Sequence, residues 1–314
     1  MTAIAHNAKR TTARDLYPSR TGGDYRLLPR RDPVACGSPA DGPLDEASLD
    51  RYVRDGSLHL PGFFGQDAIA PLIEELECMR DDAAITRREE AITEPGSGAL
   101  RSLFAVHLLD CATAELCRHP RIVSVARQIL GSAAYILQSR INYKPGFHGR
   151  EFFWHSDFET WHVEDGLPRM RTLSCSISLT ENTAMNGPLM LVPGSHHSFL
   201  SCAGETPEEN YKRSLKRQDL GVPDPAHLER MVEDGGLVNA TGPAGSVTFF
   251  DCNVMHGSGS NITPWPRSNV FVVFNSVENP LSAPFNGLAP RPEFLAHRKA
   301  VDIPAPARRE VTLL

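Results

Sequence analysis

Residues 134–155 read AYILQSRINYKPGFHGREFFWH. Two runs of β-branched and aromatic residues, at 135–142 and 152–155, stand on either side of a segment that contains Pro145, Gly146 and Gly149. Runs of this composition bounded by Gly and Pro are typical of short β-strands. The stretch therefore predicts two strands, and the second of them ends at His155.

Four further runs of the same kind follow at residues 173–179, 189–192, 246–250 and 270–275. Many short strands with Gly and Pro between them favour a sandwich or a jelly roll over a parallel α/β sheet. We therefore expect a mainly β fold, with helices confined to its flanks.

The first third of the chain has helical periodicity instead. Apolar residues recur at intervals of three and four from Ile69 to Met79, and Asp67 is a candidate N-cap for this helix. A second helix is predicted over residues 116–130, followed by Gly131 where a left-handed C-cap is expected. These helices are the predicted flanking elements.

These patterns predict one domain with two tails. We expect an N-terminal tail over residues 1–43, partly disordered or docked, a single domain over 44–300 and a C-terminal tail over 301–314. Residues 201–236 are charged, only weakly periodic and too long for a hairpin loop. We interpret them as an insertion, either a lid over a site or a surface excursion without function.

Composition narrows the class of partner. The formal net charge of -6 provides no basic field for nucleic acid, so a small molecule is the expected partner. No run of 18 apolar residues is present, and a membrane partner is not expected. Seven cysteines without a C-x-x-C motif argue against a disulfide framework and a cysteine zinc site, and suit a reducing cytoplasm.

His155 and Asp157 form a His-x-Asp motif. Non-haem iron(II) oxygenases bind the metal with two histidines and one carboxylate, which leaves positions open for cosubstrate and oxygen. On a strand, residues i and i+2 point to the same face, so both side chains could reach one ion. The motif alone is weak, since His162 with Glu164 and His227 with Glu229 have the same spacing. Only His155 follows an aromatic run that resembles a strand entering a core.

His256 is the candidate third ligand. It follows the apolar run 246–250, and we expect it on a later strand that faces the first across the barrel. Arg267 stands shortly before the run 270–275. Because a guanidinium makes two parallel charge-assisted hydrogen bonds to a carboxylate, Arg267 is suited to the distal carboxylate of 2-oxoglutarate.

At these residues the sequence resembles the phytanoyl-CoA-hydroxylase-like branch of the 2-oxoglutarate dioxygenases, over roughly residues 60–279. The stretch GPLMLVPGSH at 187–196 belongs to this resemblance. Within the branch, FFWHSDFETWHVEDGLP at 152–168 is similar to the signature of the ectoine hydroxylases, which make 5-hydroxyectoine. The family fold is a double-stranded β-helix, a cupin-like jelly roll, and this agrees with the predicted strands.

The resemblance also implies roles. It implies Fe(II), 2-oxoglutarate and O2, the release of succinate and CO2, a role in compatible-solute biosynthesis and osmoprotection, and a cytoplasmic homodimer. Its iron ligands fall on His155, Asp157 and His256. Its 2-oxoglutarate contacts fall on Lys144, Arg267, Asn142 and Ser176, and its substrate contacts on Gln138, Trp161, Phe250 and Asn269, with Arg140 and Thr160 as further candidates.

The residue types suit such a substrate. Ectoine carries a delocalised cationic ring and a carboxylate, so Trp161 and Phe250 could provide cation–π surface and Gln138 or Arg140 a polar anchor. Three alternatives stay open: the same chemistry on another small cyclic amino acid, a non-catalytic cupin-like binding protein, and a zinc enzyme. The chain lacks an H-E-x-x-H motif for the last of these.

Overall fold

The computed structural model describes residues 14–94 and 97–303, and in this part of the chain the strands form three sheets. The large sheet has seven strands in the order β2 (Ser57–Leu60), β11 (Val247–Asp251), β7 (Thr172–Ser178), β13 (Arg267–Ser276), β5 (Ala134–Lys144), β4 (Leu100–Phe104) and β3 (Ala91–Thr93). A four-stranded sheet has the order β10 (Val238–Asn239), β8 (Met190–Leu191), β12 (His256–Ser258) and β6 (Phe152–His155). A third sheet pairs β1 (Arg26–Pro29) with β9 (Ser198–Ser201).

The six predicted strands are all present, with small shifts at their ends. The large sheet is antiparallel throughout, and its centre is the long pair β5 and β13. The sequence patterns did not predict β1, β2, β3, β4, β9, β10 or β12. The expectation of a mainly β fold with flanking helices is confirmed.

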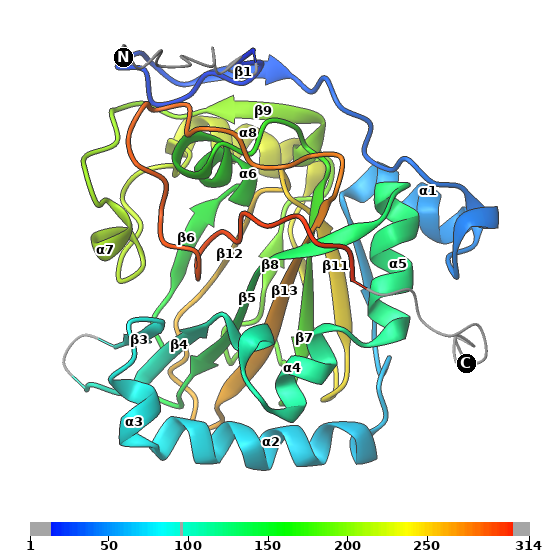
Figure 1. Cartoon of the computed structure of the whole chain (residues 1–314), viewed down its shortest axis with the longest axis vertical. Helices are drawn as coiled ribbons and strands as arrows, with labels where there is room; N and C mark the ends of the chain where they lie inside the picture. Colours follow the sequence, from blue (N-terminus) through cyan, green and yellow to red (C-terminus); the bar gives the residue numbers. More distant parts are fainter. Residues whose placement is uncertain (1–13, 95–96, 304–314) are drawn as a thin grey trace, which may run out of the picture.

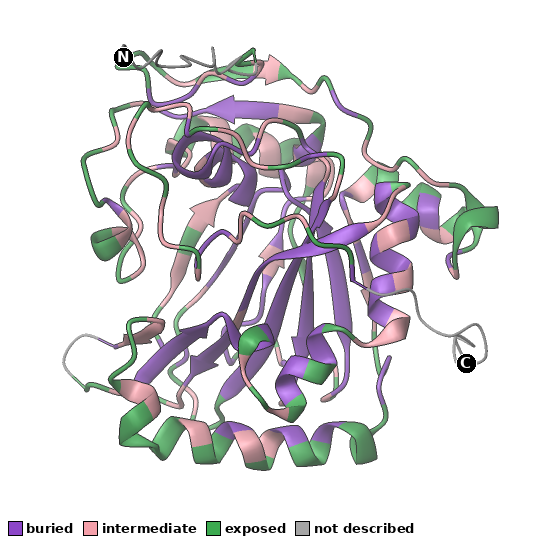
Figure 2. Ribbon diagram, in the orientation of Figure 1, coloured by how far each residue is buried: buried purple, intermediate pink, exposed green. Residues whose placement is uncertain are grey.

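The large sheet has one apolar and one polar face. On β5, Ile141 and Tyr143 enter the main hydrophobic core, whereas the alternate residues Arg140 and Asn142 line a cavity. Side chains alternate across a strand, so this one strand serves the core and the site at once. Figure 2 shows the central strands buried along their length.

Helices cover the apolar face of the large sheet. The main core joins residues of its strands to apolar residues of α1 (Glu46–Asp55), α2 (Gln66–Asp81) and α5 (Pro120–Leu130), and α2 runs across the lower end of the sheet in Figure 1. The other helical elements are α3 (Ala83–Thr86), α4 (Ala112–Cys117), α6 (Asp157–Thr160), α7 (Tyr211–Ser214), α8 (Pro225–Gly235), the π-helix η3 (Trp161–Asp165) and three short 3-10 turns, η1 (Pro39–Asp41), η2 (Val106–Leu108) and η4 (Ser195–His197).

Two details of the predicted helices differ. The N-cap of α2 is Gly65, and Asp67 lies inside the first turn, where a carboxylate still interacts favourably with the helix dipole. The predicted helix over 116–130 is two helices, because Pro120 lacks an amide hydrogen and begins α5 rather than continuing α4. Gly131 ends α5 with φ 60°, as expected for a left-handed C-cap.

Segments from both ends of the chain lie against the polar side of the barrel (Figure 1). In the N-terminal segment, β1 pairs with β9, and the buried ring of Tyr17 contacts Phe158 and Phe199. Residues 280–303 form a strap: the amide of Ser282 donates to Gly166 O at 2.9 Å, and the amide of His297 donates to Leu137 O at 2.7 Å. The remaining parts of the expected tails, 1–13 and 304–314, lie outside the described residues.

Across the described ranges, no helix combines the length and the apolar character that a membrane span requires.

Candidate metal centre

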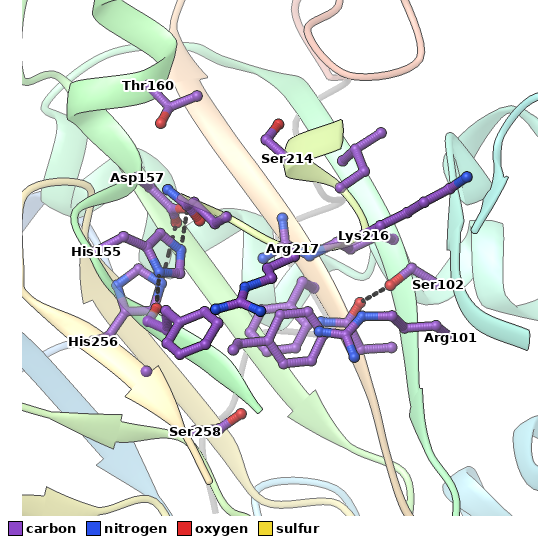
Figure 3. A pocket seen from close by; sticks show the side chains of 18 of the residues that line it. Arg101, Ser102, His155, Asp157, Thr160, Ser214, Lys216, Arg217, His256 and Ser258 are labelled. Atoms are coloured by element: carbon purple, nitrogen blue, oxygen red, sulfur yellow. Dashed lines mark hydrogen bonds and ion pairs between the residues drawn. The ribbon is translucent and has the colours of Figure 1, made fainter. Parts of the chain in front are cut away.

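His155, Asp157 and His256 come together at one point of the barrel (Figure 3). Nε2 of His155 lies 3.6 Å from Oδ1 of Asp157, and Nε2 of His256 lies 3.8 Å from Oδ2. Of the residues that the structure describes, these three alone form a group of His, Cys, Asp or Glu side chains whose ligand atoms all lie within 4.8 Å of one another. Two imidazoles and one carboxylate are the donor set of the non-haem iron(II) oxygenases.

Both imidazoles are oriented by backbone carbonyl groups. Nδ1 of His155 donates to Phe153 O at 2.6 Å, and Nδ1 of His256 donates to Val254 O at 3.0 Å. Since Nδ1 is the donor to a carbonyl in both rings, Nε2 is the atom that each imidazole presents to the other ligand atoms. This is the outer-shell arrangement that metal-binding histidines use.

The ionisation states suit a divalent metal. Burial raises the pKa of Asp157, but the neighbouring His256 and His155 outweigh this effect and hold the pKa below its ordinary value. Burial, with a further contribution from His155, lowers the pKa of His256 to about 4. At neutral pH the group therefore offers one carboxylate and a neutral imidazole, the forms that bind metals.

Two expectations about how the ligands are positioned were wrong. Asp157 is not on the strand with His155: β6 ends at His155, and Asp157 begins α6 after the N-cap Ser156. His256 does not face His155 across the barrel. It begins β12, which lies beside β6 in the four-stranded sheet, and the two histidines are direct cross-strand partners. Adjacent strands bring the rings to a centroid distance of 4.3 Å, closer than opposite walls would.

The competing motifs have structural partners. His162 is buried and bonded through Nδ1 to Leu167 O and through Nε2 to Asp15, while Glu164 pairs with Arg20. His227 binds Asp224 near the start of α8. The structural surroundings of the three motifs, rather than their identical residue spacing, therefore distinguish the metal-binding motif from the other two.

Arg267 lines the same cavity as the metal-binding group, whereas Lys144 lies outside the lining, and neither has a carboxylate partner among the described residues. Arg267 begins β13, is 2% exposed and lines the cavity, yet its Nε and Nη1 atoms have no hydrogen-bond partner among the described residues. Lys144 donates to Ser258 Oγ at 2.7 Å and to Gly259 O at 2.6 Å. Unpaired buried donors are rare and costly, so a guanidinium that faces a cavity indicates an anionic ligand.

The other predicted cosubstrate contacts form a polar ladder on the same face of the sheet. Asn142 lines the cavity and accepts from Ser102 Oγ at 2.8 Å. Its cross-strand partner is Asn269, which was predicted as a substrate contact; Asn269 donates through Nδ2 to Ser176 Oγ at 2.9 Å, and its Oδ1 has no partner in the described part of the chain. Ser176 and Asn269 lie behind the cavity wall rather than in it.

Of the six predicted substrate contacts, four line the cavity, whereas Phe250 and Asn269 lie outside its lining. Gln138, Arg140, Thr160 and Trp161 all line it. Gln138 donates to Leu295 O at 2.5 Å and accepts from Arg140, whose guanidinium lies 4.9 Å from the ring centre of Phe271. Phe250 lies outside the lining and packs its ring 5.1 Å from that of His256.

Several residues that line the cavity could not be predicted from the sequence. Arg101 and Phe104 come from the short strand β4, and Arg291 and Leu295 come from the C-terminal strap. The tip of the insertion contributes the run 214–218, and Arg217 reaches across the cavity in Figure 3. These side chains lie in short or irregular segments without periodicity, so only long-range contacts place them in the site.

The chain is similar to proteins of known class. The family described as phytanoyl-CoA dioxygenase (PhyH) matches residues 52–269. A Bordetella bronchiseptica protein named ectoine dioxygenase is 58% identical over 290 residues, which are 92% of this chain and 94% of that protein. A Streptomyces avermitilis protein of the same name is 53% identical over 289 residues, 92% and 98% of the two chains.

Two solved structures are similar over nearly the whole chain. EctD from S. alaskensis with 2-oxoglutarate and 5-hydroxyectoine has a TM-score of 0.84 and 45% identity, covering 93% of this chain and 98% of that one. The same protein with bound Fe has a TM-score of 0.80 and 43% identity, covering 94% and 96%. This likeness confirms the expected jelly-roll core with flanking helices.

Proposed function

The chain belongs to the phytanoyl-CoA dioxygenase family, and on that premise we propose that it is an Fe(II)- and 2-oxoglutarate-dependent dioxygenase that hydroxylates ectoine to 5-hydroxyectoine. The observation that carries the proposal is Arg267. Its guanidinium is buried, its Nε and Nη1 atoms have no partner among the residues that the structure describes, and it lines the same cavity as the three metal-binding side chains. A metal-binding group and a buried guanidinium at one cavity fit a cosubstrate that binds the metal at one end and carries an anionic group at the other.

The protein residues prepare the reaction in two ways. His155, Asp157 and His256 would hold the metal from one side and leave its other side open to the cavity. Arg267 and Lys144 would hold the distal carboxylate of 2-oxoglutarate, with Asn142 in the cavity wall beside it and with Ser176 and Asn269 behind that wall. When bound, Fe(II) with 2-oxoglutarate supplies the oxidising chemistry, in which one atom of O2 enters the substrate as a hydroxyl group, the other enters succinate, and CO2 is released.

The other end of the cavity suits a compact zwitterion. Trp161 presents an aromatic ring for the cationic ring of ectoine, and Arg140 and Gln138 offer polar anchors for its carboxylate. Burial lowers the pKa of Arg140 because it disfavours the charged guanidinium. A carboxylate ligand would stabilise that charge. Phe250 supports His256 from behind. Fixed placement of one C–H bond beside the metal would decide which carbon is hydroxylated.

Each alternative has a discriminating feature. A passive cupin-like binder has no need for an unpaired Arg267 beside a metal-binding group. Another small cyclic amino acid would use the same iron chemistry, and it differs only in the contacts made by Trp161, Gln138 and Arg140. A zinc enzyme would bind the same three ligands but would need a general base near the open side of the ion.

The test is an assay of succinate. Purified protein is incubated with Fe(II), 2-oxoglutarate and air, and with ectoine, proline or a CoA ester as substrate. We expect ectoine to stimulate succinate formation with one product that carries one added oxygen. The anaerobic complex with Fe(II) and 2-oxoglutarate should also show a weak visible charge-transfer band, which zinc cannot produce. Succinate formation stimulated by proline instead of ectoine would contradict the substrate assignment.

We further propose that segment 201–236 closes over the site. We also propose that the protein is a cytoplasmic homodimer. The seven cysteines, all within the described ranges, are free, which suits a reducing compartment. Phe147, Ile262 and Trp265 are 62%, 80% and 60% exposed on two touching loops, and such an apolar patch suits a second copy of the chain. Light scattering during gel filtration tests the assembly; a monomer at micromolar concentration would contradict it.

A further inference from the structure

Arg20 is a buried cation in the N-terminal segment that reaches the helix carrying the site. Its backbone has a φ of 53°, an uncommon conformation for a residue with a side chain, and its side chain is 1% exposed. Nε and Nη2 bind the two carboxylate oxygens of Glu159 at 2.9 and 2.5 Å, and Nη1 binds Glu164 at 2.5 Å. One guanidinium thus clamps both α6 and the π-helix η3.

The same guanidinium contacts a residue of the cavity wall. Nη2 of Arg20 donates to Oγ1 of Thr160 at 3.0 Å, and Thr160 lines the cavity. Arginine has only donors, so the hydroxyl of Thr160 must act as the acceptor in this bond. Its own hydrogen has no acceptor among the described residues and remains available for a group in the cavity. Figure 3 places Thr160 on the same side of the cavity as Asp157.

Arg20 also touches the base of the insertion whose tip, residues 214–218, lines the cavity. Nη1 donates to Thr206 Oγ1 at 3.3 Å, and Glu164 accepts from Asn210 Nδ2 at 2.9 Å. At the other side of the insertion, a side chain at Gly221 would collide with Glu159 and with Arg20. The cluster around Arg20 therefore contacts both arms of the insertion.

We propose that Arg20 is a positioning residue for substrate recognition: it fixes the Thr160 hydroxyl as a hydrogen-bond donor into the cavity, so that the site favours a substrate with an acceptor there, such as a carboxylate. This inference rests on the proposed function. A lysine would keep the charge but could not bind Glu159, Glu164 and Thr160 together, because it lacks the planar fork. The effect should be confined to the substrate, since Arg20 contacts neither the metal-binding group nor Arg267.

The test compares Arg20→Lys, Thr160→Val and Thr160→Ser with the wild type. Ectoine binding is measured by calorimetry on the anaerobic complex with Fe(II) and 2-oxoglutarate, alongside kcat and the KM for each substrate. We expect Arg20→Lys and Thr160→Val each to weaken ectoine binding by about 10- to 100-fold, the range for a hydrogen bond to a charged group. Thr160→Ser should bind normally. The double variant should be little worse than either single variant, since both changes remove one interaction.

Arg30→Gln is the matched control for a merely structural role. Arg30 lies in the same N-terminal segment and makes a buried two-point ion pair with Asp251, at 2.8 and 2.9 Å, but it does not line the cavity. This variant should lose thermal stability yet keep its affinity for ectoine. Equal losses of ectoine affinity in Arg20→Lys and Arg30→Gln would overturn the proposal, as would an unchanged affinity in Arg20→Lys. A wild type that binds no ectoine would instead contradict the proposed function.

Discussion

Arg267 and Lys144 are direct cross-strand partners in the antiparallel ladder between β13 and β5. Like charges that face each other across a ladder repel, and here both side chains are also almost fully buried. Burial and the charge of Arg267 lower the pKa of Lys144 to about 6, and burial with Arg101 lowers the pKa of Arg267 to about 10. The pair is therefore unfavourable in the free protein, and an anionic ligand offsets this cost.

Replacing Arg267 with Gln should weaken the cosubstrate while sparing the fold. Loss of one partner of a buried charge pair costs about 2–5 kcal/mol of binding, so the KM for 2-oxoglutarate should rise by roughly 30- to 4,000-fold. The ligand-free variant should melt no lower than the wild type, because the change removes a buried charge whose Nε and Nη1 atoms have no hydrogen-bond partner in the described part of the chain. Steady-state kinetics and a thermal melt measure the two effects.

Arg150→Gln is the control for this change. Arg150 lines the same cavity but is exposed, so screening by water should keep the effect on the KM within about threefold. An Arg267→Gln variant with an unchanged KM for 2-oxoglutarate would refute the role of the guanidinium.

Lys144 should take up a proton when 2-oxoglutarate binds. Its pKa in the free protein is about 6, so the amine is largely neutral above that pH, and a bound carboxylate raises the pKa by favouring the charged form. The affinity for 2-oxoglutarate should therefore be greatest below about pH 6 and fall as the pH rises toward the pKa of the complex. Anaerobic calorimetry at pH 7.5 in two buffers of different ionisation enthalpy counts the protons.

The Lys144→Met variant should show neither the proton uptake nor the pH dependence over this range. If the wild type binds 2-oxoglutarate without taking up a proton, the neutral state of Lys144 in the free protein is wrong.

Asp157 is the carboxylate of the metal-binding group, and Asp157→Asn should remove both iron affinity and turnover. Outer-shell partners of metal ligands contribute about 10- to 100-fold in affinity, so loss of a direct ligand should weaken Fe(II) binding by more than about 100-fold. A competition assay with a chelator measures the affinity. Glu229→Gln, in the competing motif at 227–229 on the exposed side of α8, is the control and should behave like the wild type. Hydroxylation retained by Asp157→Asn would contradict the assignment.

The parts of the fold that sequence reasoning predicted are those dictated by local pattern. The β-branched and aromatic runs at β5, β6 and β13 are long or strongly apolar, and they appear as strands within a few residues of the predicted bounds. By contrast, β12 reads only HGS and has no strand-like composition. It is a strand because it fits between β6 and β8, a contact that a local pattern does not contain.

The same distinction applies to the site. His155, Asp157 and His256 could be named from residue type and context, but their backbone setting could not, since Asp157 begins a helix and His256 pairs with His155. Arg20 and Arg291 lie in irregular segments near the two ends of the chain. They reach α6 and η3 only because those segments fold back over the barrel, where Arg20 binds Glu159 and Arg291 binds Asp165.

Trp161 provides a test of how the cavity recognises a cationic ring. It lines the cavity and is 3% exposed, so its ring would contact a bound ligand away from water. A desolvated cation–π contact contributes about 2 kcal/mol, and Trp161→Leu should raise the KM for ectoine by roughly 30-fold, with Trp161→Phe intermediate. The KM for 2-oxoglutarate should not change. Trp265→Leu, at a ring that is 60% exposed, is the control. If Trp161→Leu lowers thermal stability but leaves the KM for ectoine unchanged, the ring serves only to pack the core.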